Sequence, residues 1–448
     1  MNLNNIHNVY FIGIGGIGMS ALANYFSSTG KIVAGYDRVE TTITKSLSEK
    51  NITIHFEDAV TLIPEQFKNK ENTIIVFTPA IPTDNNELIF FNKNGFTVLK
   101  RSEMLGEITK NTFCLAVAGT HGKTTTSTIL GHILEVNKVN ATSFLGGISE
   151  NYNSNLILGG DKVTVVEADE FDRSFLNLSP NIACITSMDA DHLDIYKNKT
   201  ALEDSFKEFA SKVSETLFVK KGLSIFGKTF AVNETADYSA TNLKINQGSY
   251  VFDIKTPTEI VKNIQINLPG KHNVLNTVAA LAMANSFGIS IPAIAKALLT
   301  FKGVKRRFSY KIKTEKLVLI DDYAHHPTEI NAIVDAVKEM YPNRKNIGIF
   351  QPHLFSRTKD FADDFAKSLS RFDEVILLDI YPAREKPIKG ITSNWLLEKI
   401  ENKNKLLSSK KYIVANIKKS KASVVVMIGA GDIGELVEKV TQKLKSED

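Results

Sequence analysis

Residues 113–134 read FCLAVAGTHGKTTTSTILGHIL and carry the pattern that decides the fold of this chain. The apolar run Phe113–Ala118 is typical of a buried strand, and Thr124–Leu134 has the length and composition of a helix. The short loop between them, Gly119–Thr125, contains two glycines and a lysine. A strand, a glycine-containing loop and a helix in this order predict a phosphate-binding unit of an α/β domain, because backbone N–H groups and the helix start can cradle phosphate oxygens.

The loop also has the side chains that this chemistry needs. Lys123 would reach the terminal phosphates of a nucleotide, and the hydroxyl of Thr124 would bind Mg²⁺. The loop is a shortened variant of the standard pattern, because Val117 stands where that pattern has its first glycine. The predicted phosphate-binding residues are Gly119, Thr120, His121, Gly122, Lys123, Thr124 and Thr125.

Outward from this loop, strand-like apolar runs alternate with helical patterns along almost the whole chain. That alternation predicts an α/β fold with parallel sheets. The 448 residues are too many for one ordinary core, and contents of 43% hydrophobic and 23% charged residues exclude the disordered and fibrous classes. We expect three domains, formed by residues 1–103, 104–301 and 302–448.

Charge, cysteines and the N-terminal region indicate where the protein works. The net charge is only +5, and no basic block with interleaved aromatic residues occurs, so we expect no nucleic-acid partner. Cys114 and Cys184 lie in apolar runs, which is typical of core residues in a reducing compartment. The uncharged run Val9–Phe26 approaches the length of a membrane span, but glycines crowd its first half and no basic residue precedes it. These features predict a cytoplasmic protein with no membrane partner.

A second kind of glycine loop follows the first strand-like run. The run Val9–Ile14 leads into GIGGIG at Gly13–Gly18, and a predicted helix, Ile17–Ser28, begins inside that loop. Such glycines let the backbone approach a pyrophosphate, and Asp37 is placed to bind a ribose hydroxyl. Taken alone, the pattern favours a dinucleotide site, with a tight structural turn as the alternative. A similar loop near the C-terminus, Gly429–Gly434, is either another such site or a packing device.

Candidate metal ligands follow two strand-like runs of the middle domain. Glu167 ends the apolar run Val163–Val166, and His192 follows the run Ile182–Ser187. The carboxyl ends of parallel strands face the crevice in which ligands bind, and Mg²⁺ prefers oxygen ligands. We expect Glu167 and His192 to hold a metal ion together with Thr124, although a solvated acidic loop and a surface histidine would give the same pattern.

Polar residues also follow the strand-like runs of the third predicted domain. Leu317–Ile320 leads into the sequence DDYAHHPT at Asp321–Thr328, and Ile347–Phe350 leads to His353 and Arg357. Any one of these residues could be a helix cap or a surface charge. Because the carboxyl ends of parallel strands meet at one edge, we expect them to contribute jointly to a site.

The order of these motifs resembles that of the Mur ligases, the ATP-dependent amide-forming enzymes of peptidoglycan precursor synthesis. The resemblance covers the whole chain. Its eight motifs are GIGGIGMSA at 13–21, AGTHGKTTT at 118–126, EADEFDRSF at 167–175, DADHLD at 189–194, GKHNVLN at 270–276, RRF at 306–308, DDYAHHPTE at 321–329 and QPHLFSRT at 351–358.

The resemblance implies a fold of three α/β domains: an N-terminal Rossmann-like domain that binds UDP, a central domain similar to P-loop ATPases and a C-terminal Rossmann-like domain. The first glycine loop would then hold the UDP of a sugar nucleotide rather than NAD, since either ligand offers a pyrophosphate to a helix start. The implied UDP-sugar-binding residues are Gly13, Gly15, Gly16, Ile17, Gly18, Asp37, Thr78, Ala80 and Ile81.

The implied reaction joins L-alanine to the lactyl carboxylate of UDP-N-acetylmuramate through an acyl phosphate, with ATP and Mg²⁺. The implied catalytic residues are Lys123, His192, Arg307 and His326, and the implied metal ligands are Thr124, Glu167 and His192. Beyond the phosphate loop, ATP would contact His272, Asn273, Asn276, Arg307 and Asp322. The amino acid would contact His325, His353 and Arg357.

Some positions depart from the family pattern or leave it open. Leu354 and Phe355 stand where the family usually has arginine and tyrosine, which removes one possible carboxylate partner. Some sister ligases use a carbamylated lysine as a metal bridge, and either Lys207 or Phe209 could occupy that position here. The protein is expected to be a monomer or a homodimer.

Three other functions compete with this one. A nicotinamide-dependent oxidoreductase would explain the loop Gly13–Gly18 and Asp37 but leaves Lys123 and Glu167 without a role. A regulatory or transport NTPase would hydrolyse ATP without joining two substrates. Within the family, a sister ligase would attach a preformed peptide to the same sugar nucleotide, although its first glycine loop usually departs from GIGGIGMS.

Overall fold

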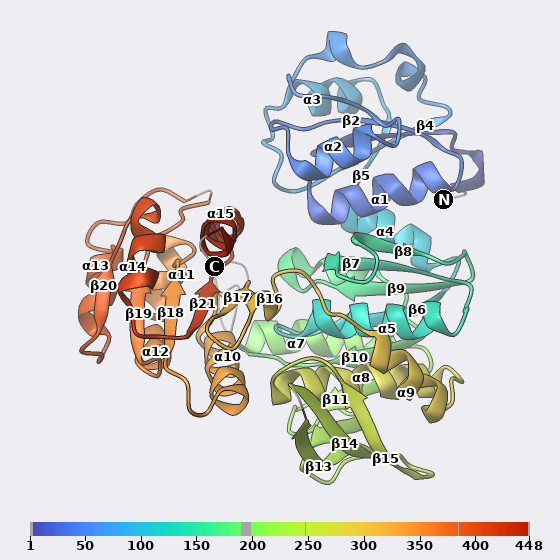
Figure 1. Ribbon diagram of the computed structural model, residues 1–448. Coiled ribbons are helices and arrows are strands. Elements are labelled where there is room, and N and C mark those ends of the chain that lie inside the picture. The colour runs from blue at the N-terminus through green and yellow to red at the C-terminus, as the bar shows by residue number, and fades with distance from the viewer. Residues whose placement is uncertain (1–2, 190–198, 247, 384, 447–448) are drawn as a thin grey trace. The chain divides into compact units, whose positions relative to one another are not determined.

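The computed structural model describes residues 3–189, 199–246, 248–383 and 385–446 and divides into two compact units. The first unit comprises Met1–Asn242, Phe252–Gln265 and Leu275–Lys302. The second comprises Leu243–Val251, Ile266–Val274 and Gly303–Asp448. Figure 1 shows that sheets flanked by helices build both units, which confirms the predicted α/β fold.

The first unit begins with a five-stranded parallel sheet of order β3-β2-β1-β4-β5. This is the order of a Rossmann-like sheet, and it places the end of β1 where the order reverses, the position at which such sheets bind ligands. The strands are β1 (Asn8–Ile12), β2 (Ile32–Tyr36), β3 (Thr53–His55), β4 (Thr73–Phe77) and β5 (Thr97–Lys100). The accompanying helices are α1 (Ile17–Ser28), α2 (Thr42–Ser48), α3 (Asn86–Lys93) and α4 (Arg101–Thr109).

A ten-stranded sheet of order β15-β14-β13-β12-β11-β10-β6-β9-β7-β8 follows in the chain. Its central strands β10, β6, β9 and β7 are parallel, and β8 pairs antiparallel with β7. The strands are β6 (Phe113–Ala118), β7 (Ala141–Ser149), β8 (Ser154–Leu158), β9 (Val163–Ala168), β10 (Ile182–Ile185), β11 (Thr216–Lys220), β12 (Lys228–Val232), β13 (Tyr238–Asn246), β14 (Ser249–Lys255) and β15 (Ile260–Ile266). The helices are α5 (Lys123–Val136), α7 (Lys199–Ser211), α8 (Lys271–Ser286) and α9 (Ile291–Thr300).

One continuous apolar cluster joins the first two predicted domains. Phe11 and Phe26 beside the first sheet belong to the same buried cluster as Phe144 and Phe175 of the next segment. The predicted boundary between residues 103 and 104 falls inside α4, whose Gly106 lies so close to the carbonyl oxygen of Asn177 that a Cβ would be only 2.5 Å from it. Because the first sheet and the segment that follows it share this buried apolar cluster, they belong to one compact unit.

The second unit contains a six-stranded sheet of order β16-β17-β21-β18-β19-β20. Only β16 is antiparallel to its neighbour among the described strands of this sheet. The strands are β16 (Ser309–Lys313), β17 (Val318–Asp322), β18 (Asn346–Phe350), β19 (Glu374–Leu377), β20 (Lys405–Leu407) and β21 (Val424–Ile428). The helices are α10 (Pro327–Met340), α11 (Phe355–Asp360), α12 (Ala362–Leu369), α13 (Ser393–Lys399), α14 (Ile413–Lys419) and α15 (Ile433–Lys445).

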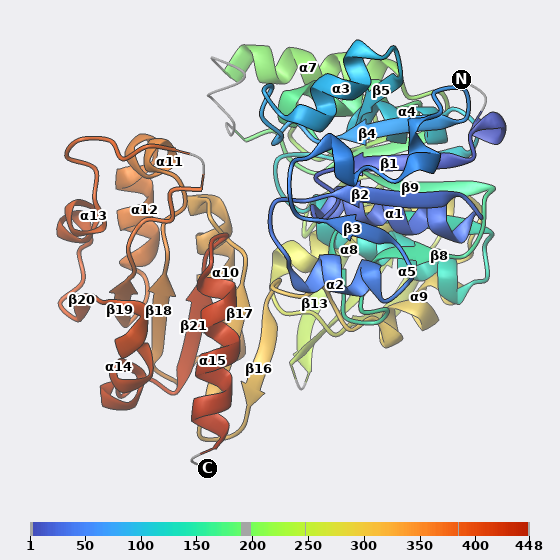
Figure 2. The same cartoon turned by 90° about the horizontal axis from the view of Figure 1, so that it is seen from above.

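Alternating side chains of this sheet fill two apolar cores. Along β17, Val318 and Ile320 face the cluster beneath α10 and α12, whereas Leu319 faces the cluster beneath α14 and α15. This alternation follows from the two-residue period of a strand and explains why a sheet covered on both faces reads as a continuous apolar run. Figure 2 shows α15 lying along one side of this sheet, next to β21 and β17.

The predicted elements agree closely with the observed ones. The strand predicted at Phe113–Ala118 and the helix predicted at Ile17–Ser28 have those bounds in the structure. The uncharged run Val9–Phe26 is divided between β1 and α1. Among the helices of the described residues, none has the length and apolar character that a membrane crossing requires.

Candidate active site

The phosphate loop lies between β6 and α5, where glycine is required twice. Gly119 and Gly122 have φ angles of +134° and +83°, which other residues rarely adopt. A Cβ on Gly119 would clash with the hydroxyl of Thr186 after β10, and one on Gly122 would lie 2.5 Å from Oδ1 of Asn276 on α8. The loop is therefore pressed against two neighbouring elements, and Asn276, a predicted ATP contact, lies beside it.

Hydrogen bonds to the segment after β10 fix the shape of the loop. The hydroxyls of Thr120 and Ser187 lie 2.9 Å apart, and the N–H of His121 donates to Oγ of Ser187 at 2.8 Å. The N–H of Asp189 donates to Oγ1 of Thr120 at 3.0 Å, and its carboxylate lies 3.4 Å from Nε2 of His121. The side chains of these two predicted phosphate-binding residues thus hold the loop in place.

Lys123 forms a buried ion pair that sequence reasoning did not assign. Its Nζ donates to the carbonyl of Gly119 at 2.7 Å and to Oε2 of Glu170 at 2.6 Å, and the Glu170 side chain is 0% exposed. Burial by itself lowers the pKa of Lys123, but the charges of Glu170, Asp169 and Glu167 raise it above its ordinary value. Lys123 therefore stays positively charged beside the loop. The sequence contains one indication of this pair, since an acid that follows a buried strand needs a partner when it is itself buried.

Two of the three predicted metal ligands meet beside the loop. The hydroxyl of Thr124 donates to Oε1 of Glu167 at 3.1 Å, and Oε2 of Glu167 accepts the N–H of Gly146 at 3.0 Å. Hydroxyl and carboxylate oxygens are ligands that suit Mg²⁺. The third predicted ligand, His192, lies outside the described residues. Within the described part of the chain, no three histidine, cysteine or acidic residues gather as a metal cluster.

The first glycine loop lies at the end of β1 and is hydrogen-bonded to Asp37. The N–H of Gly15 donates to Oδ2 of Asp37 at 2.7 Å. Gly13, with a φ angle of +87°, needs to be glycine, because a Cβ there would lie 2.7 Å from the methyl group of Thr78. Asp37, predicted to bind ribose, thus contacts the loop itself in this structure.

The turn that follows β4 completes the predicted UDP site. The N–H of Ile81 donates to the carbonyl of Thr78 at 3.0 Å, and Ala80 is exposed between them. Thr78 and Ile81 both lie close to Gly13. The fold therefore brings the turn and the glycine loop together, and the binding of UDP by them stays a prediction.

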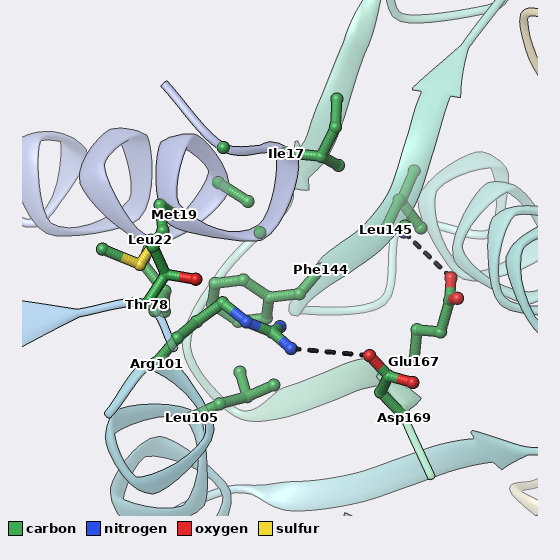
Figure 3. Close-up of a pocket in the computed structure, with 14 residues that line it drawn as sticks. Ile17, Met19, Leu22, Thr78, Arg101, Leu105, Phe144, Leu145, Glu167 and Asp169 are labelled. Atoms are coloured by element: carbon green, nitrogen blue, oxygen red, sulfur yellow. Dashed lines mark hydrogen bonds and ion pairs between the residues drawn. The ribbon is translucent and has the colours of Figure 1, made fainter. Parts of the chain in front are cut away.

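A cavity of about 290 Å³ extends from the first glycine loop to the acidic residues after β9 (Figure 3). In it, Nη2 of Arg101 lies 3.8 Å from Oδ2 of Asp169. Arg101 was not predicted, although it directly follows β5 and the same end-of-strand rule that identified Glu167 would have indicated it. The lining includes Gly16, Ile17, Gly18, Thr78, Arg101, Phe144, Glu167 and Asp169.

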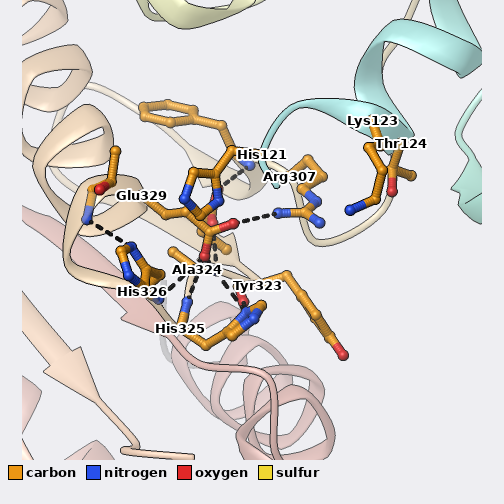
Figure 4. Close-up of polar contacts among 12 residues, drawn as sticks. His121, Lys123, Thr124, Arg307, Tyr323, Ala324, His325, His326 and Glu329 are labelled. Atoms are coloured by element: carbon orange, nitrogen blue, oxygen red, sulfur yellow. Dashed lines mark hydrogen bonds and ion pairs between the residues drawn. The ribbon is translucent and has the colours of Figure 1, made fainter. Parts of the chain in front are cut away.

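In the second unit, Glu329 on α10 organises several predicted residues (Figure 4). Its Oε1 lies 3.7 Å from Nη1 of Arg307, and its Oε2 accepts the N–H of His325 at 2.9 Å. The Arg307 guanidinium also lies 5.3 Å from the centre of the Tyr323 ring. Arg307, a predicted catalytic residue, is thus positioned by a carboxylate and an aromatic face.

His326 has a structural role as the N-cap of α10. Its Nδ1 accepts the N–H of Thr328 at 3.3 Å, and its own N–H donates to Glu329 at 3.2 Å. The ring is buried and packs at 4.8 Å on Phe361. Its implied catalytic role stays a prediction, because these contacts account for a histidine at this position.

Asp322, a predicted ATP contact, binds the backbone in this structure. Its Oδ2 accepts the N–H of Phe308 at 2.7 Å, and its Oδ1 accepts the N–H of Ala324 at 2.8 Å. Burial raises the pKa of Asp322 to about 7, against the opposing effects of Arg307 and these two N–H groups. The carboxylate therefore fixes the loops on which Arg307 and His325 lie.

Replacement of Asp322 by asparagine is expected to destabilise the second unit by about 1–3 kcal/mol, because an amide nitrogen would then face a buried backbone N–H. The free energy of unfolding is to be measured in urea well above pH 7, because the pKa of the wild-type carboxylate is about 7. Asp335→Asn, a change at an exposed aspartate of α10, serves as the control. Unchanged stability combined with a raised KM for ATP would contradict the structural role and favour the nucleotide contact.

The predicted amino-acid-binding residues gather at the ends of β17 and β18. The rings of His325 and His353 lie 6.2 Å apart, and His353 stacks on Tyr381 at 5.7 Å. Tyr381 was not predicted. Arg357 lies on α11, which begins after Leu354, a residue with the unusual φ angle of +68°. Non-glycine residues in such conformations are often found at functional sites.

The predicted ATP contacts near α8 divide between the two units. In the second unit, burial and then the charge of Arg307 lower the pKa of His272 to about 4, so this histidine is neutral. Asn273, also in the second unit, donates from Nδ2 to the carbonyl of Pro269 at 2.6 Å. Asn276 belongs to the first unit.

The C-terminal glycine loop is a packing device. A Cβ on Gly429 would lie 2.9 Å from the backbone carbonyl oxygen of Gln351, and one on Gly431 would lie 2.6 Å from the side-chain amide oxygen of the same residue. A Cβ on Gly434 would lie 2.6 Å from the guanidinium of Arg306. Protein groups occupy the space that these glycines leave, which supports the packing interpretation of this loop.

The two residues considered for the position of a carbamylated lysine, Lys207 and Phe209, both lie on α7. Lys207 is exposed on α7 and donates to Asp204 at 3.0 Å. Phe209 is buried and stacks on Phe175 with ring centres 4.9 Å apart. The structure assigns a metal-bridging role to neither residue.

Three family models match this chain in order, and known relatives match almost all of it. A UDP-N-acetylmuramate–L-alanine ligase of Christiangramia forsetii is 62% identical over 100% of this chain and 99% of its own length. The crystal structure of a UDP-N-acetylmuramate–alanine ligase from Thermotoga maritima superposes with a TM-score of 0.84 at 28% identity, covering 98% of this chain and 100% of that one. A murein peptide ligase from Psychrobacter arcticus has a TM-score of 0.71 at 23% identity, covers 98% of each chain and shares the fold.

The three family models match three successive segments of the chain. They are described as the Mur ligase catalytic domain at residues 8–112, the Mur ligase middle domain at 117–284 and the Mur ligase glutamate ligase domain at 306–434. The nicotinamide interpretation of the first glycine loop is wrong, because the same loop lies within the first of these domains. The chain belongs to the Mur ligase family.

Proposed function

We propose that this chain joins L-alanine to the lactyl carboxylate of UDP-N-acetylmuramate, with cleavage of ATP to ADP and phosphate. The observation that carries the proposal is the position of Glu167. Its carboxylate contacts Thr124 of the phosphate loop and also lines the cavity that begins at the first glycine loop. A phosphoryl donor and a UDP-linked acceptor can therefore meet within one unit. The 62% identity to a ligase named for this reaction supports the choice of substrates.

The chemistry explains why both ligands are needed. A carboxylate is a poor acyl donor, so its oxygen first attacks the γ-phosphorus of ATP and forms an acyl phosphate with release of ADP. The amine of L-alanine then attacks the acyl carbon, and the tetrahedral intermediate collapses to the amide, releasing phosphate and a proton. Phosphoryl transfer depends chiefly on positioning and charge neutralisation. Lys123 supplies a fixed positive charge for this step.

Thr124 and Glu167 fit a magnesium ion, because both present oxygens within 3.1 Å of each other beside the phosphate loop. Bound there, Mg²⁺ would neutralise charge on the ATP phosphates. Thr124 and Glu167 would orient those phosphates toward the cavity. His192 would be a further ligand.

Two further groups of predicted residues would bind the sugar nucleotide and the amino acid. The start of α1, with Thr78 and the turn to Ile81, would hold the UDP moiety, because a helix start stabilises anions. In the second unit, His325, His353 and Arg357 would bind the amino acid, and a guanidinium suits its planar carboxylate. We further propose that the protein works in the cytoplasm, where ATP and nucleotide sugars are available, as a monomer or a homodimer.

The test of this proposal is the release of ADP from Mg-ATP in the presence of UDP-N-acetylmuramate, with and without L-alanine. We expect turnover that requires both substrates and a product whose mass equals that of UDP-N-acetylmuramoyl-alanine. Turnover with L-alanyl-γ-D-glutamyl-diaminopimelate but not with L-alanine would favour the sister ligase. ADP release that ignores both substrates would instead indicate a regulatory NTPase.

A further inference from the structure

Arg101 links the two ends of the cavity. It is the first residue of α4, directly after β5. Its guanidinium lies against the first turn of α1, so close that a Cβ on Gly18 would be 2.8 Å from Nη1. On the other side, Nη2 lies 3.8 Å from Oδ2 of Asp169. Figure 3 marks this ion pair with a dashed line.

The positive charge of Arg101 lies at the same end of the cavity as the start of α1. Among the described residues that line the cavity, Arg101 has the only positive charge, and its charged neighbours are Glu167 and Asp169. Helix α1 begins beside it, and its N-cap, Gly16, provides no side-chain hydrogen bond to the helix start. A helix start and a guanidinium therefore attract negative charge to the same end of the cavity.

The ion pair with Asp169 orients the Arg101 side chain but is weak. The two charged groups are partly exposed, with exposed fractions of 26% and 38%, and the distance of 3.8 Å is long for a hydrogen-bonded pair. Exposed ion pairs of this kind contribute little free energy. The guanidinium can therefore form stronger bonds with a phosphate while Asp169 keeps it directed into the cavity.

We propose that Arg101 binds the diphosphate of the sugar nucleotide and that Gly18 is glycine chiefly to make room for this guanidinium. The inference rests on the proposed function and names a substrate-binding residue for it. Gly18, read from the sequence as a backbone contact to the ligand, then acts through the space that it leaves for Arg101.

The test compares two sugar nucleotides by isothermal titration calorimetry. UDP-N-acetylglucosamine has the diphosphate but no lactyl carboxylate, whereas UDP-N-acetylmuramate has both. We expect Arg101→Ala to weaken the binding of both about 10- to 100-fold, the scale of losing hydrogen bonds to a charged group. Arg101→Lys should recover part of the loss, because it restores the charge without the fork. Binding of ADP alone should not change.

The control is Lys110→Ala, which removes one positive charge from the far end of the same helix and should leave both affinities unchanged. Weaker binding of UDP-N-acetylmuramate alone would overturn the proposal and assign Arg101 to the carboxylate. Unchanged binding of both nucleotides would also overturn it. If the wild-type protein binds neither nucleotide, the proposed function fails and the inference fails with it.

A double-mutant cycle tests the role of Gly18. Gly18→Ala would displace the guanidinium, so it should weaken both nucleotides in the wild-type background but have little further effect in Arg101→Ala. Fully additive losses in the double variant would overturn the idea that Gly18 acts through Arg101. Thermal unfolding of each variant shows whether a loss of binding reflects a loss of folding, and Arg101→Lys provides the folded comparison.

Discussion

Replacement of Lys123 by alanine is expected to lower kcat by at least about 10²-fold, the scale of losing one preorganised charged donor. The ammonium group is held by the carbonyl of Gly119 and by Glu170, and its raised pKa keeps it charged. It therefore places a fixed positive charge beside the loop, which the ATP phosphates of the proposed reaction would meet without reorganisation. The measurement is steady-state release of ADP with saturating UDP-N-acetylmuramate and L-alanine.

The same substitution removes the partner of a buried carboxylate. Glu170 would remain fully buried without Lys123, and breaking a buried pair in this way costs about 3–5 kcal/mol of stability. The double variant Lys123→Ala/Glu170→Gln should therefore recover much of the unfolding free energy without recovering kcat. This comparison separates the loss of a catalytic charge from the loss of the fold.

Lys162→Ala provides the matched control, because this lysine is exposed next to β9 and its removal changes the net charge equally. Its kcat should equal that of the wild type. A Lys123→Ala variant that folds and keeps kcat within about threefold of the wild type would refute the assignment, since the loss of such a donor is far larger.

Glu167→Gln is expected to raise the Mg²⁺ concentration required for half-maximal activity by at least about 10- to 100-fold, because even outer-shell changes have effects of that size on metal affinity. The substitution exchanges a charged oxygen ligand for a neutral amide. It also places an amide nitrogen near the hydroxyl of Thr124 or the N–H of Gly146, both of which donate to Glu167. The measurements are a Mg²⁺ titration of ADP release and direct Mn²⁺ binding by electron paramagnetic resonance.

Asp161→Asn is the control for Glu167→Gln, because it removes one negative charge near the opposite end of β9 from an exposed position. Its Mg²⁺ titration should superimpose on that of the wild type. If Glu167→Gln also titrates like the wild type and binds Mn²⁺ equally well, then Glu167 serves only to bind Thr124 and Gly146.

Local sequence was sufficient to predict the parts of the site that lie on one strand and its following loop. The strand Phe113–Ala118 and the loop after it were predictable because apolar runs, glycines and a lysine specify them locally. The meeting of Thr124 with Glu167 was also predictable, since β6 and β9 are parallel neighbours whose carboxyl ends share one edge.

The same end-of-strand rule could not tell functional residues from structural ones. Asp322 and Glu167 both lie at the carboxyl end of a strand and both accept backbone N–H groups. Glu167 also contacts Thr124 of the phosphate loop, whereas both carboxylate oxygens of Asp322 bind the backbone. The glycine loops at Gly13–Gly18 and Gly429–Gly434 also read alike, and the packing of Gln351 and Arg306 against the second loop supports a structural role that its sequence did not reveal. A sequence motif shows which residues are present. Whether a residue has a functional or a structural role depends on which atoms its side chain contacts in the folded protein.

The sequence by itself determined the order of strands, glycine loops and helices, and with it the α/β fold, because each of these depends on residues close together in the chain. Only the tertiary structure decided that Glu170, rather than Asp169 or Glu167, binds Lys123, and that Arg101 lies against Gly18. Those pairings join residues far apart in the chain. They depend on the path of the turn after β9 and on the packing of α4 against α1, which strand register and core burial set together.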